Sequence, residues 1–313
     1  MRFLVVGAGA LGGYFGGRLL QAGHDVTFLL RPARAAQLAA SGLVIHSPAG
    51  DLHLASPPTV LAHQLQPHYD VVIVGCKAYD LDETIASFAA AVGPETVVLP
   101  LLNGLRHLDT LTARFSYRRV LGGLGLISAT LDETGAVLHL SQDHTLAFGE
   151  LDGERTPRVE AIAAAFAQAA FVGRLSDSIL QEMWEKWVHI ATIASITTLM
   201  RASIGDIVGA GADGLALDLL DECSRIAAHN GFAPRPEAIA RTRATVTAPD
   251  SRLTASLLKD IERGAPTEGE HILGDFLRRG RWSTADTILL PVAYAQVKSY
   301  ERQRAGRAAL LHA

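Results

Sequence analysis

Three glycines near the N-terminus have the spacing of a phosphate-binding turn. Gly7, Gly9 and Gly12 form a Gly-x-Gly-x-x-Gly motif directly after a short apolar run. The first glycine permits a tight turn, the second lets a pyrophosphate approach the backbone, and the third lets the next helix pack closely. The N–H groups at the start of that helix then face the phosphates. In this turn the predicted cofactor-binding residues are Gly7, Gly9, Ala10, Leu11 and Gly12.

An arginine indicates which dinucleotide binds. Sites for NAD usually place Asp or Glu at the end of the second strand, where it binds the ribose 2′-hydroxyl. Here that place holds Arg31, and no carboxylate lies between Val26 and Asp51. A guanidinium is a fixed cation whose fork suits a 2′-phosphate, so the sequence favours NADP(H). The alternative is a solvated loop arginine.

The segments around the glycine motif alternate between strand and helix. Apolar runs at 3–6 and 26–30, with a helix-like stretch at 11–22 between them, have the length of a βαβ unit. Further strands are predicted at 43–46, 51–54, 70–76, 96–99, 120–130 and 136–148, and helices at 80–91 and 158–170. The last two strands are predicted to be antiparallel. The pattern predicts an α/β fold with a Rossmann-type, doubly wound sheet.

Two polar residues follow predicted strands. Lys77 comes directly after the strand at 70–76, and Asn103 follows the strand at 96–99. Ligands in open α/β sheets bind outside the carboxyl ends of the strands, so both side chains are candidates for the cofactor crevice. Alternatively, Asn103 and Gly104 form a simple turn pair.

The second part of the chain has a different pattern. Strand signals stop near residue 175, and helical segments follow at 178–201, 203–210, 213–230, 235–247, 251–263, 267–280 and 284–303. This change predicts two domains. We expect a Rossmann-like domain at 1–175 and an all-α domain for substrate binding or dimerisation at 176–313.

Composition narrows the classes of function. The net charge of −4 and the pI near 6.3 give no reason to expect nucleic acid or membrane as a partner. The N-terminal apolar run continues into the glycine turn and is no signal peptide, and two cysteines without CxxC spacing fit a reducing cytoplasm. The histidines lack metal-ligand spacing, so no metal site is predicted. The apolar, helix-rich second part is compatible with a homodimer.

Short motifs along the whole chain resemble those of the ketopantoate reductase (2-dehydropantoate 2-reductase) family. They are Gly-Ala-Gly-Ala-Leu-Gly at 7–12, Cys-Lys-Ala at 76–78, Leu-Asn-Gly at 102–104, Trp-Glu-Lys at 184–186, Ser-Leu-Leu-Lys-Asp at 256–260 and Thr-Glu at 267–268. The resemblance implies an oxidoreductase of pantothenate biosynthesis that uses NADPH to reduce a 2-oxo acid to the 2-hydroxy acid.

The resemblance also implies roles for single residues. By motif match these fall on Lys186 (general acid), Glu268 (active-site carboxylate and cofactor contact), Ser256 (substrate contact), Asn103 (substrate and cofactor contact), and Lys77 and Arg31 (cofactor contacts).

Physical chemistry bears on the lysine and the glutamate. Reduction of a ketone creates an alkoxide, which a protonated lysine can stabilise and protonate. Lys186 lies in an otherwise apolar helix, where burial would lower its pKa, and Glu268 is the candidate carboxylate that would oppose that shift. Alternatively, Lys186 extends to solvent beside Glu182 and Glu185. Glu268 has an alternative too, as the first residue of a helix capped by a Thr267–Glu270 capping box.

The chain departs from the family pattern at three positions. Many members carry asparagines one and two turns after the lysine, where this chain has Ile190 and Ala194. A third asparagine is replaced by Leu253, which is predicted to share a helix face with Ser256, so that Ser256 is alternatively a core serine bonded to its own backbone. Without these groups the pocket is more apolar, which puts ketopantoate itself in doubt. Candidate polar replacements are His189, Thr192, Thr197 and Arg201.

The sequence therefore predicts a cytoplasmic NADPH-dependent reductase of a small 2-oxo acid, either 2-dehydropantoate or a less polar ketone. One alternative keeps the fold and the cofactor but has a different carbonyl substrate. The other is a nucleotide-binding sensor that no longer catalyses.

Overall fold

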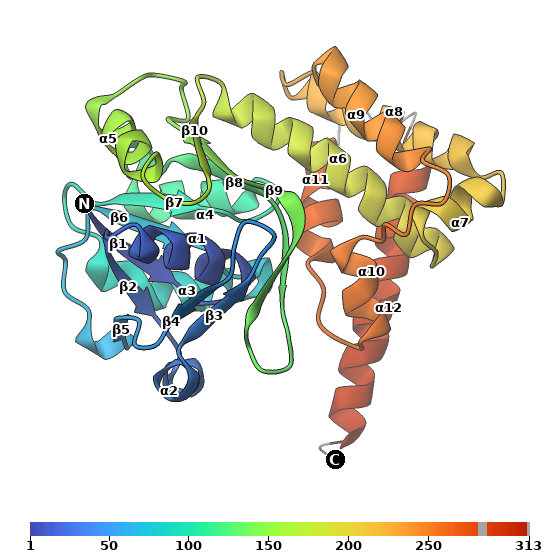
Figure 1. Ribbon diagram of the computed structural model, residues 1–313. Helices are drawn as coiled ribbons and strands as arrows, with labels where there is room; N and C mark the ends of the chain where they lie inside the picture. The colour runs from blue at the N-terminus through green and yellow to red at the C-terminus, as the bar shows by residue number, and fades with distance from the viewer. Residues whose placement is uncertain (281–286, 312–313) are drawn as a thin grey trace. The chain divides into compact units, whose positions relative to one another are not determined.

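The structure, a computed structural model, describes residues 1–280 and 287–311. It divides into two compact units, Met1–Leu180 and Gln181–Ala313. The sequence pattern predicted the boundary between the two domains after residue 175. Figure 1 shows the strands gathered in the first unit, while the second is built from helices. The predicted fold class, a Rossmann-type α/β domain followed by an all-α domain, is confirmed.

A parallel sheet forms the centre of the first unit. Its strands are continuous apolar runs, because a parallel sheet is buried on both faces. They stand in the order β5, β2, β1, β6, β7, and all neighbouring pairs are parallel. Their bounds are Arg2–Val6 (β1), Asp25–Leu29 (β2), Thr59–Val60 (β5), Val71–Val74 (β6) and Val97–Pro100 (β7). The chain moves from β1 outward to β2 and later resumes on the other side of β1 with β6. This creates the switch point at which open α/β sheets bind ligands.

A second sheet takes the remaining strands, in the order β10, β9, β3, β4, with β8 paired to β9. Their bounds are Leu43–His46 (β3), Leu52–Leu54 (β4), Gly122–Leu131 (β8), Val137–Gly149 (β9) and Val172–Leu175 (β10). The predicted antiparallel pairing of the two late strands is confirmed by β8 and β9. The parallel pairing of β3 with β9 joins segments about 90 residues apart and has no local sequence signal.

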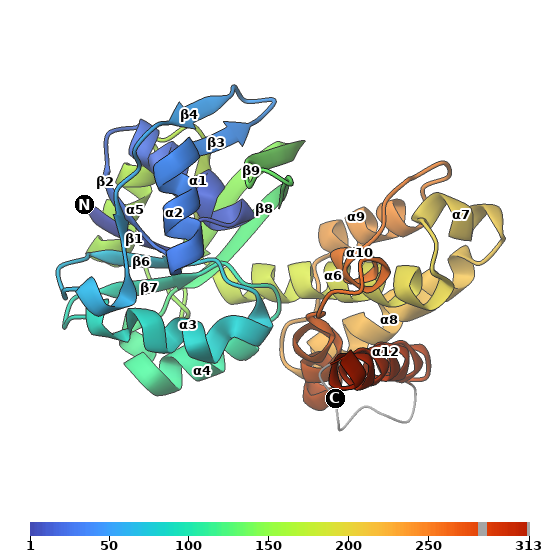
Figure 2. The ribbon, with the colours of Figure 1, turned by 90° about the horizontal axis from the view of Figure 1, so that it is seen from below.

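Helix α1 (Ala10–Gln21) packs against both sheets, which explains its many glycines. A Cβ on Gly16 would lie 2.7 Å from the ring of Phe28 in β2, and a Cβ on Gly17 would lie 2.8 Å from Ile45 in β3. Figure 2 shows α1 on one side of the parallel sheet and two later helices, α3 (Leu81–Phe88) and α4 (Arg106–Phe115), along the other side. These glycines allow α1, which begins at the glycine turn, to lie close to both sheets.

The other helices and turns of this unit are connections. They are α2 (Pro32–Ser41), α5 (Pro157–Phe166) and the 3₁₀ turns η1 (Ala62–Gln64), η2 (Ala78–Asp80), η3 (Ala89–Ala91) and η4 (Tyr117–Arg119). The predicted helix at 80–91 is therefore divided into η2, α3 and η3. Helices α2 and α4 were not predicted, nor were the two-residue strand β5 and the strand β10. Their apolar periodicity is short, and packing on the sheet stabilises them.

The second unit is helical throughout its described part. Its elements are α6 (Ile179–Met200), α7 (Ile204–Gly209), α8 (Asp213–His229), α9 (Pro236–Val246), α10 (Ser256–Glu262), the π-helical turn η5 (Glu270–Gly274), α11 (Asp275–Arg279) and α12 (Leu289–Leu311). The predicted helix at 251–263 begins only at Ser256, and the one at 267–280 begins as a π-helical turn. Of the predicted helix at 284–303, residues 284–286 lie outside the described part.

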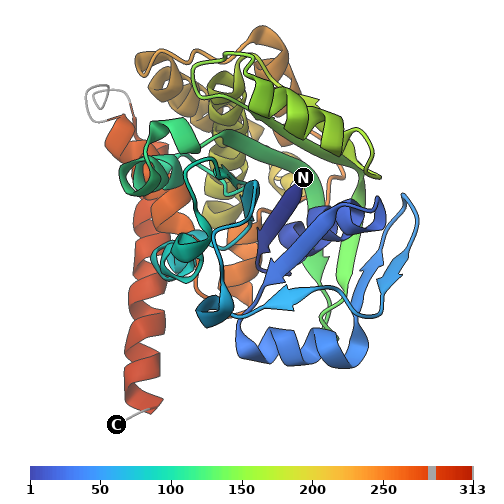
Figure 3. The ribbon, with the colours of Figure 1, turned by 90° about the vertical axis from the view of Figure 1, so that its left-hand side faces the viewer.

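Helix α6 contributes many buried residues to the second unit, and α12 packs against α8 and η5. Residues 191–198 of α6 are all buried, and Trp187 is fully buried. The buried Glu222 of α8 accepts hydrogen bonds from the backbone N–H groups of Ile288 and Leu289 at 2.8 and 2.9 Å, and from that of Leu290 at 2.9 Å. This carboxylate caps the start of α12, the long helix visible at the C-terminus in Figure 3.

Candidate functional site

The glycine turn has the backbone geometry that its motif predicts. Gly7 has a φ of 88°, which favours glycine, and its N–H donates to the carbonyl of Leu29 at 2.9 Å. A Cβ on Gly12 would lie 2.1 Å from the carbonyl oxygen of Gly7, so no other residue fits there without a shift of the turn. Beside Gly9 there is open space for at least 4 Å. The turn thus leaves room for a group at the start of α1.

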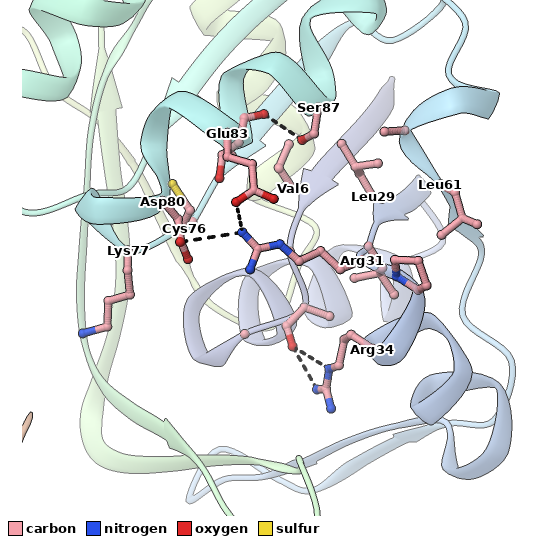
Figure 4. A pocket seen from close by; sticks show the side chains of 18 of the residues that line it. Val6, Leu29, Arg31, Arg34, Leu61, Cys76, Lys77, Asp80, Glu83 and Ser87 are labelled. Carbon is pink, nitrogen blue, oxygen red and sulfur yellow. Dashed lines mark hydrogen bonds and ion pairs between the residues drawn. The ribbon is translucent and has the colours of Figure 1, made fainter. Parts of the chain in front are cut away.

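A cavity of about 640 Å³ opens at the carboxyl ends of β1, β2 and β6 (Figure 4). Four predicted cofactor residues, Gly7, Gly9, Arg31 and Lys77, line it. The other lining residues are Val6, Ala8, Leu29, Leu30, Pro32, Arg34, Leu61, Ala62, His63, Gly75, Cys76, Asp80, Glu83, Thr84, Ser87 and Leu131. The lining combines the glycine turn with apolar side chains and a few charged groups, as small-molecule sites usually do.

Other predicted cofactor residues lie outside the lining of this cavity. Ala10, Leu11 and Gly12 belong to the first turn of α1, directly after the lining residue Gly9. Asn103 follows β7 and is half-buried, and the next residue, Gly104, has a φ of 74°. The structure therefore places Asn103 at the carboxyl edge of the sheet but not in the walls of this cavity.

Two carboxylates that the sequence reasoning missed hold Arg31. Its Nη2 lies 2.8 Å from Oε2 of Glu83 and 3.7 Å from Oδ1 of Asp80. The side chains of Arg31 and Glu83 are 62% and 72% exposed. Figure 4 shows the guanidinium of Arg31 pointing toward both carboxylates, with the side chain of Lys77 directed away from them. The sequence could have indicated these two residues by their position, because Asp80 and Glu83 lie at the start of the helix that follows β6.

Arg34 has a structural task instead. Its Nη2 donates to the carbonyl oxygens of Ala8 at 2.9 Å and of Gly135 at 2.8 Å. It therefore ties the glycine turn to the loop between β8 and β9, and Figure 4 shows its guanidinium on the far side from Glu83.

In the second unit, Lys186 and Glu268 influence each other electrostatically. Lys186 is half-buried on α6, and Glu268 is buried. Burial lowers the pKa of Lys186 to about 8, while the negative charge of Glu268 acts in the opposite direction. The neighbouring Glu185 forms a pair with Arg235, with an Nη2–Oε2 distance of 2.6 Å. A lysine with this pKa is mostly protonated at neutral pH and can still release its proton.

The predicted capping box before Glu268 is wrong. Glu270 does not reach back to Thr267. It pairs with Arg278 at 2.5 Å and Lys298 at 3.3 Å and accepts a hydrogen bond from the hydroxyl of Tyr294. The backbone N–H of Thr267 donates instead to Oε1 of Glu301, at 2.7 Å, from α12. Position 267 is capped by a residue far along the chain, which local spacing could not predict.

A π-helical turn connects Glu268 with the lysine helix. The carbonyl oxygen of Glu268 accepts a hydrogen bond from the N–H of Ile272 at 2.8 Å, at the start of η5. The indole N–H of Trp187, next to Lys186, donates to the carbonyl of Ile272 at 2.9 Å. Single π-helical turns are rare and are often found at functional sites. This bond joins α6, which carries Lys186, to the turn that follows Glu268.

His189 is the polar neighbour of Lys186 on α6. Residues three apart share a helix face, and Nδ1 of His189 lies 3.0 Å from the hydroxyl of Thr242 in α9. Burial, with the charges of Arg241 and Lys186, lowers the pKa of His189 to about 4, so its imidazole is neutral at neutral pH. The structure thus supplies a fixed, neutral hydrogen-bonding ring beside the lysine.

Of the remaining candidate polar groups, two threonines bond to the backbone of their own helix, and Thr197 also accepts a hydrogen bond from the N–H of Ala255 at 3.4 Å. Thr192 and Thr197 are fully buried and donate to the carbonyl oxygens of Val188 and Ile193 in their own helix, at 2.8 and 2.7 Å. Arg201 lies beyond the end of α6, with a φ of 50°.

Comparison with known proteins agrees with this architecture. Residues 3–153 match the family model described as ketopantoate reductase PanE/ApbA, and residues 178–301 match the model of its C-terminal part. The chain belongs to the ketopantoate reductase family. This is a family of oxidoreductases. The first matched segment lies in the first unit, and all but residues 178–180 of the second segment lie in the second unit.

Relatives cover the whole chain. An uncharacterized oxidoreductase of Bacillus subtilis, YkpB, is 37% identical over 305 residues, which are 97% of this chain and 100% of that protein. A 2-dehydropantoate 2-reductase of Archaeoglobus fulgidus is 32% identical over 283 residues, covering 89% of this chain and 90% of the relative. The crystal structure of 2-dehydropantoate 2-reductase from Methylococcus capsulatus superimposes with a TM-score of 0.85 at 27% identity, over 97% of this chain and 98% of that chain.

One expectation drawn from the ketopantoate reductase motifs needs correction. Ser256 and Leu253 do not share a helix face, because α10 begins at Ser256 and Leu253 precedes it. Ser256 is exposed, and so is Leu253, at 39%. Ser256 is therefore no core serine, and it stands at the start of a helix. On α6, Ile190 is half-buried and Ala194 is buried.

Two further findings concern the described residues alone. Within 1–280 and 287–311, no group of His, Cys, Asp and Glu is arranged to hold a metal ion. Over the same ranges, no helix is both long enough and apolar enough to span a membrane.

Proposed function

We propose that this member of the ketopantoate reductase family reduces a small 2-oxo acid to the 2-hydroxy acid with NADPH, and that Lys186 is the general acid. One observation carries the proposal: burial lowers the pKa of Lys186 to about 8, and a buried carboxylate, Glu268, keeps it charged. A purely structural lysine at a helix surface would have neither feature.

The residues of the first unit fit a nicotinamide dinucleotide. A Cβ at Gly12 would collide with the turn, Gly9 faces open space, and the cavity beyond them is apolar with charged groups at its rim. Gly7, Gly9 and the first turn of α1 would bind the pyrophosphate, and Arg31 would face the 2′-phosphate. When bound, such a cofactor supplies the hydride.

Lys186 supplies the proton and the positive charge. With a pKa of about 8 it is protonated at neutral pH, so it stabilises the developing alkoxide of the substrate and then transfers a proton to it. The negative charge of Glu268 favours the charged form of the lysine. The neutral ring of His189, which Thr242 orients, is available to hydrogen-bond a polar group of the substrate.

Three apolar residues favour a substrate less polar than ketopantoate. Ile190, Ala194 and Leu253 stand where many family members have asparagines. A site loses discrimination for a hydroxyl group when the groups that would bond it are absent. The second candidate is therefore the same reduction on a 2-oxo acid with an apolar side chain.

The test is a substrate panel with two lysine variants. NADPH oxidation is followed with ketopantoate and with 2-oxo acids of graded apolar side chains. Lys186→Met should lower kcat by about 10²- to 10⁴-fold with every substrate that turns over. Lys259→Met, which removes an exposed lysine of α10, is the matched control and should keep the rate of the unaltered protein.

Full turnover by Lys186→Met would disprove the general-acid role. NADPH binding without turnover of any carbonyl compound would favour the sensor alternative.

A further inference from the structure

Two carboxylates at the rim of the cofactor cavity already occupy the cation expected to bind a 2′-phosphate. We propose that Glu83, assisted by Asp80, sets the cofactor preference of this protein. Its carboxylate competes with a 2′-phosphate for Arg31 and thereby weakens the preference for NADPH over NADH. The inference rests on the proposed function and adds a specificity-determining residue to its cofactor site.

Of the two carboxylates, Glu83 makes the closer contact with Arg31. The Nη2–Oε2 distance of 2.8 Å is that of a direct, charge-assisted hydrogen bond, whereas Asp80 at 3.7 Å contributes through its charge. Figure 4 shows the two carboxylates and Arg31 side by side at the cavity. Glu83 lies in the first turn of α3, and Asp80 precedes that helix.

Arg34 cannot replace Arg31 without loss. Three of its contacts are to the carbonyl oxygens of Ala8 and Gly135, at 2.8 to 3.2 Å. Releasing Arg34 would leave those backbone groups without these bonds and would loosen the glycine turn from the β8–β9 loop. The cation available to the 2′ position of the ribose is therefore Arg31, and the carboxylates of Glu83 and Asp80 offset its positive charge.

Electrostatics fixes the sign of the effect. A 2′-phosphate that binds Arg31 comes within several ångströms of Glu83. Repulsion between a carboxylate and a phosphate dianion at about 6 Å, in a water-like dielectric, weakens binding on the order of tenfold. A ribose 2′-hydroxyl carries no such penalty and can donate to the carboxylate, as it does in NAD sites.

The exposure of the pair keeps this effect separate from folding. Arg31 and Glu83 are 62% and 72% exposed, and exposed ion pairs contribute little to stability. A substitution at Glu83 therefore alters the charge that a ligand meets while the surrounding structure stays as it is. The opposite role is also physically reasonable, namely that Glu83 orients Arg31 for the phosphate, and it predicts the opposite sign.

The experiment measures binding of two halves of the cofactor to the full-length protein by isothermal titration calorimetry. Adenosine 2′,5′-bisphosphate carries the 2′-phosphate, and 5′-AMP lacks it. Glu83→Gln should raise the affinity for the bisphosphate about tenfold and should leave the affinity for 5′-AMP the same or lower.

Asp82→Asn is the matched control. Asp82 is an exposed carboxylate next to Glu83 on α3, and it does not line the cavity. Its removal should change either affinity by less than about twofold, because solvent screens its charge.

The two possible failures differ. If both compounds bind and Glu83→Gln leaves the bisphosphate affinity unchanged or weakens it, the inference is wrong while the cofactor site stands. If neither compound binds, the cofactor assignment falls together with the inference. A tenfold gain in a protein that oxidises no NADPH would support the inference and contradict the proposed reductase activity.

Discussion

Two of the pairs of opposite charges in this protein differ in burial, and the comparison shows what burial adds. The rim pair, Arg31 with Glu83, is mostly exposed to solvent and joins two side chains by a direct hydrogen bond. The interior pair, the half-buried Lys186 with the buried Glu268, lies in the second unit, where burial lowers the pKa of the lysine to about 8. Each pair joins one cation and one carboxylate, but the two pairs suit different chemical tasks.

The difference follows from the solvent. Water screens the rim pair, so Arg31 can exchange one anionic partner for another at little cost. Burial disfavours the charged form of Lys186, and the negative charge of Glu268 partly stabilises that charged form. An exposed pair suits ligand selection, whereas an interior pair suits proton transfer.

The largest expected effect comes from exchanging lysine and arginine at the two sites. Lys186→Arg keeps the positive charge but holds its proton, so kcat should fall about 10²-fold or more. Arg31→Lys keeps the charge and loses only the fork, so the KM for NADPH should rise a few-fold, on the order of one lost hydrogen bond, with kcat unchanged. Steady-state kinetics separate the two. Equal losses of kcat in both variants would remove the distinction between the pairs.

A third carboxylate tests burial by itself. Glu222 is buried and accepts three backbone hydrogen bonds at the start of α12. Glu222→Ala should lower the free energy of unfolding by about 2–4 kcal/mol, because charge-assisted bonds and a helix cap are lost. The neighbouring Asp221 is exposed, and Asp221→Ala should change it by no more than about 0.5 kcal/mol. Urea denaturation of both variants measures the difference, and similar values would refute the capping role.

The pH dependence of turnover sharpens the comparison on the interior side. A general acid works in its protonated form, so kcat should fall as the pH rises through the pKa of Lys186, about 8. Glu268 raises that pKa, so in Glu268→Gln the fall should begin at a lower pH. Glu185→Gln is the control, since Glu185 is paired with Arg235. A pH–rate profile that Glu268→Gln leaves in place would show that Glu268 does not act on the acid.

The smallest expected effect concerns the rim pair without ligand. Glu83→Gln should leave the free energy of unfolding within about 0.5 kcal/mol of the unaltered protein, because the pair is exposed. Thermal unfolding of the unliganded proteins measures this. A large loss of stability would mean that the rim pair supports the fold, and that its effect on ligands cannot be separated from folding.

Local spacing predicted the elements well, and long-range contacts less so. The glycine turn follows from its own residues, because Gly7 needs a left-handed backbone and Gly12 must touch the carbonyl of Gly7. The capping box predicted at Thr267 does not form, because the N–H group of Thr267 donates to Glu301, 34 residues away, and not to Glu270. The competition between the two glutamates is decided by the packing of α12, which local spacing does not contain.

The candidate site shows the same division. The sequence predicted that burial lowers the pKa of Lys186 and that Glu268 opposes this shift, and both directions are confirmed. It did not predict that Glu83, 52 residues away, binds Arg31, or that Thr242, 53 residues away, holds His189. These contacts depend on which elements meet in space. The roles of these residues in binding and catalysis stay predictions.

The sequence by itself determined the order of the elements, the glycine turn, the family and the position of a lysine in an apolar helix. These depend on apolar periodicity and on backbone requirements, which neighbouring residues satisfy. The tertiary structure decided which charges meet and how much water surrounds them. Charge interactions act through space and depend on burial, so the exposed Arg31 and the interior Lys186 acquire their different properties only when the chain is folded.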